Sequence, residues 1–139
     1  MPIRAALALI SFLAAILSLA LSGAQAAPRM RGPAAEDAPS PALLRRIAAL
    51  ALKQVEFGSV SLLPVRFEGS RIAGPIAESG RVIYCVSGRM YGRTFGKPER
   101  PKLALRYDTD RLTVIDDDAI CTGHRTRPFP ELDTLGNAR

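Results

Sequence analysis

The side chains most able to do chemistry in this sequence are two cysteines and one histidine. Cys121 and His124 lie three residues apart, which resembles half of a zinc site, but a structural site needs four ligands and Cys85 is the one further thiol. A Cys–His pair could also act as nucleophile and base, yet only with a reduced thiol. No G-x-S-x-G motif is present to hold a serine nucleophile. We therefore expect no catalytic residue, no metal site and no cofactor, and we interpret His124 as a surface residue.

Aspartates gather around two expected turns, at Asp108, Asp110 and 116–118. Clustered carboxylates could bind calcium, which takes six to eight oxygen ligands, or could act as the acid and base of glycoside cleavage. Aspartate is also a favoured turn residue, because its side chain accepts a hydrogen bond from the backbone two residues on. We interpret these residues as turn residues. The alternative, a hydrolase of envelope polymers that uses a carboxylate pair, requires them to line one cleft.

A basic stretch runs from Arg89 to Arg106. It contains one acid, Glu99, and the interleaved aromatic residues Tyr91 and Phe95. Arginine presents a planar fork that binds phosphate or carboxylate, and neighbouring rings can stack on bases or sugars. The hypothesis is an anion-binding patch made of Arg89, Arg93, Lys97, Arg100, Lys102 and Arg106. The alternative is a solvent-facing set of charges on a strand and its loop.

The N-terminus has the layout of a secretory signal peptide. Arg4 precedes an apolar run from Ala5 to Leu21, and Ala24-Gln25-Ala26 then forms a small-x-small cleavage site. We expect residues 1–26 to be removed, which leaves a periplasmic or secreted protein with no stable membrane span. The alternative is a protein anchored in the inner membrane through residues 5–21, because this run is only slightly shorter than the roughly 20 residues that a spanning helix needs.

Export would also decide the state of the two cysteines. An even number of cysteines in an exported chain favours a disulfide, since the compartment outside the inner membrane is oxidising. We therefore expect a Cys85–Cys121 bond. Closing a loop of about 36 residues would stabilise the fold by roughly 3–4 kcal/mol in the chain-entropy model.

The elements that position these side chains begin after a linker. Residues 27–39 contain three prolines and no hydrophobic period, and we expect them to be disordered. Ser40 and Pro41 are typical of an N-cap and first helical position, and apolar residues then recur at three- and four-residue steps as far as Val55. This pattern predicts an amphipathic helix of about four turns that ends at Gly58.

Strand patterns follow the helix. Residues 60–67 predict an edge or bulged strand because of Pro64, and residues 68–80 predict a loop because they contain three glycines and a proline. The strongest strand pattern is at residues 81–87, rich in β-branched and aromatic side chains. Further strands are expected at 102–107 and 112–115, which form a hairpin, and at 119–122.

The fold class that follows is α+β, with one N-terminal amphipathic helix packed on a four- to five-stranded antiparallel sheet and one disulfide. We expect this domain to cover residues 40–124, with the disulfide joining the central strand to the last. Residues 125–139 are expected to form an irregular tail, with Phe129 and Leu132 against the core.

The segments IYCV, MYGRTFG and CTG, in this order after a helix, resemble a broad group of small uncharacterised exported proteins of Gram-negative bacteria that have a single disulfide. The resemblance implies a periplasmic location and no particular reaction. The net charge of +6 favours encounters with anionic surfaces. We therefore expect a non-enzymatic envelope protein that binds anionic glycan or lipid head groups, and no nucleic acid. A further alternative is an inhibitor or accessory subunit that adds an edge strand to an envelope enzyme.

Overall fold

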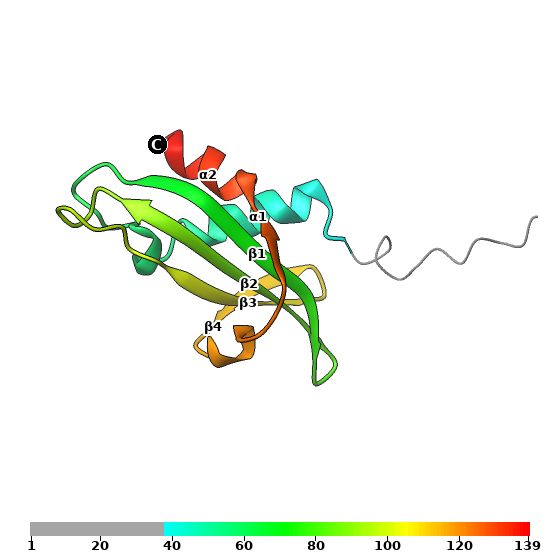
Figure 1. The fold of residues 1–139 in the computed structure, drawn as a ribbon. Helices are drawn as coiled ribbons and strands as arrows, with labels where there is room; N and C mark the ends of the chain where they lie inside the picture. The colour runs from blue at the N-terminus through cyan, green and yellow to red at the C-terminus, as the bar shows by residue number, and fades with distance from the viewer. Residues whose placement is uncertain (1–37) are drawn as a thin grey trace, which may run out of the picture. The chain divides into compact units, whose positions relative to one another are not determined.

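The structure is a computed structural model that describes residues 38–139 (Figure 1). The expected signal peptide and residues 27–37 of the expected linker lie outside this range, so their predictions stay predictions. Among the residues that the structure describes, no helix is long and apolar enough to cross a membrane.

The first helix, α1 (Pro41–Ala51), begins where the sequence predicts. The Ser40 hydroxyl oxygen accepts a hydrogen bond from the Leu43 amide at 3.1 Å, which satisfies one of the unpaired N–H groups of the first turn. Leu43, Ile47 and Ala51 are buried along one stripe of the helix. The N-cap and the apolar period of the sequence are thereby confirmed.

The predicted continuation of this helix to Gly58 is wrong. The chain leaves the helix after Ala51 and forms a short 3-10 turn, η1 (Val55–Phe57), which ends on Gly58 with a φ of +75°. Val55, expected on the apolar face, is exposed, whereas Phe57 is fully buried. The Phe57 ring packs on that of Phe67 with 6.2 Å between centroids. The short turn thus buries Phe57 in the core and leaves Val55 in solvent.

Five antiparallel strands form one sheet in the order β4-β3-β2-β1-β5. Their bounds are β1 (Arg66–Glu78), β2 (Arg81–Tyr91), β3 (Lys102–Asp108), β4 (Arg111–Ile115) and β5 (Thr126–Pro128). The predicted strand at 81–87 and the predicted hairpin of 102–107 with 112–115 are confirmed. The α+β class, with an antiparallel sheet and one disulfide, is also confirmed, although two helices rather than one cover the sheet.

Two predictions are wrong because strand β1 starts later and runs longer than expected. Residues 60–65 are not a strand, and most of the expected loop at 68–80 belongs to β1. The ladder between β1 and β2 shifts register at two places, near Gly69 and Gly74. Because a bulge absorbs an extra residue without ending the strand, and glycine tolerates its positive φ, these glycines continue the strand instead of breaking it.

Two predictions for the C-terminal segment are also wrong. The expected last strand at 119–122 is a 3-10 turn, η2 (Ala119–Cys121), and the tail expected to be irregular contains β5 and a second helix, α2 (Pro130–Asn137). The predicted burial of Phe129 and Leu132 is confirmed, since both side chains are fully buried. These two anchors hold α2 on the same side of the sheet as α1 (Figure 1).

The sheet therefore has a helix-covered face and an opposite face. The main core fills the space between the helices and the sheet and includes Ile47, Phe67 and Leu105. A smaller apolar cluster lies on the opposite face, where η2 covers the strands at the end away from Tyr91. The Cys85–Cys121 disulfide, as expected, ties η2 to β2 within this cluster. The rest of the opposite face carries polar and charged side chains, and we call it the open face.

Candidate anion-binding groove

Four cationic side chains meet in one concavity on the open face. This shallow groove has a volume of about 460 Å³ and receives side chains from three strands and the segment before β3. Its lining consists of Glu68, Gly69, Arg71, Ser87, Gly88, Arg89, Arg100 and Lys102. We call it the basic groove, since Glu68 is the one acidic residue in that lining.

The alternation of β2 explains why these side chains share a face. Successive side chains of a strand point to opposite sides, so Val86 and Met90 enter the core while Ser87 and Arg89 point to the open face. The register of the strands decides which side chains lie opposite Ser87 and Arg89. Ser87 is the cross-strand partner of Arg71 in β1 and of Lys102 in β3. Residues directly opposite one another are close enough to interact, so the hydroxyl of Ser87 stands between two cations.

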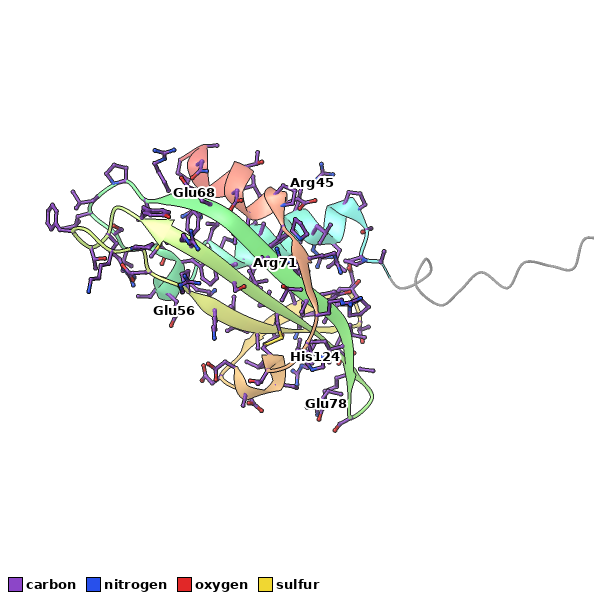
Figure 2. The ribbon with its side chains drawn as sticks, in the orientation of Figure 1. Arg45, Glu56, Glu68, Arg71, Glu78 and His124 are labelled. Atoms are coloured by element: carbon purple, nitrogen blue, oxygen red, sulfur yellow. A yellow bond between two sulfur atoms is a disulfide. The ribbon has the colours of Figure 1, made fainter. Side chains whose placement is uncertain are left out.

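Arg71 is held in place by the neighbouring strand. Its Nε donates to the Thr126 hydroxyl at 2.7 Å, and its Nη2 donates to the Thr126 carbonyl at 2.9 Å. Figure 2 shows Arg71 midway along β1, between Glu68 and Glu78. Because β5 fixes this guanidinium, it loses little further side-chain entropy when it binds a ligand.

The other three cationic side chains of the basic groove have no partner among the residues that the structure describes. Within residues 38–139, the side chains of Arg89, Arg100 and Lys102 form neither a hydrogen bond nor an ion pair, and all three residues are exposed. Glu68 is the cross-strand neighbour of Arg89 but forms no ion pair with it among these residues. The groove thus holds an excess of positive charge that other described residues do not neutralise.

The structure separates the six residues of the predicted patch. Arg89, Arg100 and Lys102 enter the basic groove, whereas Lys97 is exposed in the loop between β2 and β3. Arg106 lies on the open face but further along β3, opposite Ile83 and Thr113.

Arg93 is engaged within the protein itself. Its guanidinium forms a salt bridge with Glu99, and its Nη1 donates to the Val55 carbonyl at 2.8 Å. The hydrogen bonds from Arg93 lower the pKa of Glu99, and the same bonds raise the pKa of Arg93. Arg93 is therefore a structural cation, and it neutralises the acid of the basic stretch.

Sequence reasoning missed Arg71, which lies in the segment predicted to be a loop. The signal was present as a local alternation, because Arg71 precedes the buried Ile72 just as Arg89 precedes the buried Met90. Gly69 and Gly74 obscured it, and only the pairing of β1 with β2 and β5 shows on which face Arg71 lies.

The aspartates lie at opposite ends of β4. Asp108 and Asp110 belong to the β3–β4 turn, where Asp110 accepts a 2.6 Å hydrogen bond from Arg46 of α1 that lowers its pKa. Residues 116–118 follow the other end of the strand, and there Asp116 and Asp118 line a separate hollow with Glu56. In the four hollows described within residues 38–139, carboxylates of the two turns do not meet, while Asp116 and Asp118 share one of them, so the carboxylate-pair alternative stays a prediction.

The first candidates, the cysteines and the histidine, are placed as expected. His124 is exposed after η2 (Figure 2), and both cysteines are used in the disulfide. Across residues 38–139, no group of three His, Cys, Asp or Glu side chains could hold a metal ion.

The fold and the groove define a small α+β domain that carries a basic concavity on its open sheet face and is closed by one disulfide. Comparison with family models, with curated proteins and with solved structures finds no match for this chain. The resemblance to exported Gram-negative proteins therefore stays a prediction.

Proposed function

We propose that this protein is an exported, non-enzymatic envelope protein that binds an anionic envelope component in the basic groove. The observation that carries the proposal is the convergence of Arg71, Arg89, Arg100 and Lys102 around one concavity, with a single carboxylate beside them. Three of these cations belong to the basic stretch at residues 89–106, and the pairing of β1 with β2 brings Arg71 beside them.

The chemistry of the groove suits a phosphate, sulfate or carboxylate group. An arginine fork donates two parallel hydrogen bonds to such a group, lysine supplies a point charge, and the Ser87 hydroxyl can donate a further bond between Arg71 and Lys102. The groove is shallow and open, so it is suited to groups that project from a polymer or a surface, rather than to a small molecule that must be enclosed.

Two independent features support the exported location. The first is the signal-peptide pattern of residues 1–26, and the second is the Cys85–Cys121 disulfide, since disulfides persist mainly in oxidising compartments. An envelope location would present the groove with acidic glycans and phospholipid head groups.

The direct test measures binding of a fluorescently labelled heparin oligosaccharide at low ionic strength. The test variant replaces Arg89, Arg100 and Lys102 by Gln. The control variant replaces Arg45, Lys53 and Arg81 by Gln, which removes the same charge from exposed positions outside the groove. We expect the groove variant to bind about tenfold more weakly, from three exposed contacts of about 0.5 kcal/mol each.

The control variant should bind nearly as well as the wild type, and binding should weaken as salt is added because exposed charges are screened. An equal loss in both variants would show that net charge alone attracts the ligand. No binding of the wild type at low salt would also contradict the proposal.

A further inference from the structure

Two loops present apolar side chains to solvent at one end of the domain. The first loop covers residues 58–65 and the second covers residues 92–98, and Figure 1 shows them side by side at the left. Leu62 is 100% exposed and Phe95 is 98% exposed. Of the six large apolar side chains that are exposed among residues 38–139, five lie in these loops or in η1: Val55, Val60, Leu62, Leu63 and Phe95.

Each loop is closed beneath its apolar tip by a side-chain hydrogen bond. In the first loop the Ser61 hydroxyl donates to the Leu63 carbonyl at 2.8 Å, so Leu62 is at the apex. In the second loop the Thr94 hydroxyl donates to the Lys97 carbonyl at 3.1 Å, so Phe95 is at the apex. Local bonds of this kind fix a turn, and here each one projects the apolar residue outwards.

The two loops are also tied to each other. Gly92 approaches the first loop so closely that a Cβ atom on it would lie 2.3 Å from the Pro64 carbonyl oxygen. Arg93 donates to the Val55 carbonyl and pairs with Glu99 across the base of the second loop. The tips of Leu62 and Phe95 therefore belong to one joined element, which we call the loop end.

Positive charge adjoins the loop end. The pair formed by Arg66 and Tyr91 is the last of the β1–β2 ladder before the two loops, and Glu68 with Arg89 in the basic groove is the next pair that faces the same side. Lys97 is exposed within the second loop, and Arg100 of the groove follows it. Glu99 is neutralised by Arg93. The apolar tips therefore lie next to cationic side chains, those of Lys97 and of the basic groove.

We propose that the loop end docks on the surface of a bilayer that contains anionic lipids. Leu62 and Phe95 enter the interfacial region, while Lys97 and the basic groove face the lipid head groups. This inference rests on the proposed function of the groove and names its anion as a lipid phosphate at a membrane surface. Apolar contact combined with basic side chains is the combination by which peripheral proteins bind anionic membranes.

A bilayer fits the shape of this end better than a protein partner. The two exposed tips protrude singly instead of lining a groove, and a protein partner would need matching pockets for them. A bilayer needs no such complementarity, because its interface adapts to projecting side chains. Cations that adjoin the tips would repel a second copy presenting the same surface, whereas they attract anionic lipid.

The first test uses Phe95→Trp in the protein purified after export, with its N-terminus determined by intact mass. The chain contains no tryptophan, so this substitution supplies the only indole. Vesicles of phosphatidylcholine with or without phosphatidylglycerol are added. We expect a blue shift of the fluorescence and quenching by brominated acyl chains only where the anionic lipid is present. An unshifted spectrum on bound vesicles would overturn insertion of the tip.

The second test compares variants by vesicle sedimentation. We expect Leu62→Ser/Phe95→Ser to lower partition by about tenfold or more, because each side chain then loses apolar burial. Its binding to the heparin oligosaccharide should not change. Leu135→Ser, on α2, is the matched control for losing an exposed leucine and should partition like the wild type. Thermal unfolding of each variant establishes that it is folded.

The remaining outcomes separate the two proposals. If the wild type binds the oligosaccharide but not the anionic vesicles, the membrane inference fails and the function of the groove stands. If it binds neither, both fail. If the wild type sediments as a dimer that Leu62→Ser/Phe95→Ser dissociates, the loop end is an interface between copies and the membrane inference is overturned.

Discussion

Asn137, at the end of α2, bonds to both main-chain groups of Phe67 in β1. Its Oδ1 accepts from the Phe67 amide at 2.7 Å, and its Nδ2 donates to the Phe67 carbonyl at 2.9 Å. One turn earlier, Asp133 accepts from the amide and the hydroxyl of the buried Ser70. Strand β5 pairs with β1 only from Arg71 to Ala73, so α2 supplies partners for the edge that β5 leaves open. An unpaired edge invites aggregation, and this helix covers it.

Asn137→Ala should destabilise the protein by about 1–3 kcal/mol, since it leaves two partly buried backbone groups without partners. Urea unfolding followed by circular dichroism measures the change. Thr134→Ala, at an exposed position of the same helix, is the control and should change stability by less than about 0.5 kcal/mol. Equal stability of the two variants would show that water replaces the amide of Asn137 without cost.

Gly136→Ala should also destabilise the fold, although alanine is the better helix former by roughly 1 kcal/mol. A Cβ on Gly136 would lie 2.4 Å from Cδ2 of Phe67, whose ring is buried and cannot move aside freely. We expect a net loss of about 1–3 kcal/mol from overpacking.

The matching control for this clash is Phe67→Leu, alone and combined with Gly136→Ala. Removing the ring should remove most of the cost of the alanine, and the double-mutant cycle in urea unfolding gives the coupling. Additive effects would place the cause of any destabilisation elsewhere in α2.

Replacing both Cys85 and Cys121 by Ser should lower the free energy of unfolding by roughly 3–4 kcal/mol, because the bond closes a loop with a sequence separation of 36 residues. Differential scanning calorimetry of the variant and of reduced wild type should give the same lowered transition. Intact mass of the exported protein before and after alkylation checks the bond itself. Two alkylated cysteines without prior reduction would contradict it.

The Arg93–Glu99 pair predicts a pH dependence of stability. Its hydrogen bonds lower the folded pKa of Glu99 below its usual value of 4.5, so the stabilisation is present above that value and is lost as the pH falls through the lowered pKa. Glu99→Gln should cost about 0.5–1 kcal/mol at neutral pH. It should also flatten the acid limb of a stability–pH curve from urea unfolding. An unchanged acid limb would show that the pair contributes nothing.

Local patterns determined a good part of this protein. Ser40 caps α1 as its position before a proline predicts, and the β-branched and aromatic side chains of residues 81–87 form the strand that they predict. Asp108 and Arg111 close the predicted hairpin, because turn geometry depends on a few adjacent residues. The disulfide followed from the number of cysteines. The helix cap, the strand and the hairpin have short-range causes and can therefore be predicted directly from the sequence.

Tertiary structure decided the rest. Gly69 and Gly74 allow bulges in a strand or a loop equally well, and only pairing with β2 and β5 makes them part of β1. That pairing brings Arg71 beside Ser87, while contact with Glu99 removes Arg93 from the predicted patch. Helix α2 exists because Phe129 and Leu132 are buried against partners distant in the chain. Register and burial depend on the whole chain at once, so composition could indicate an anion-binding stretch but could not select its residues.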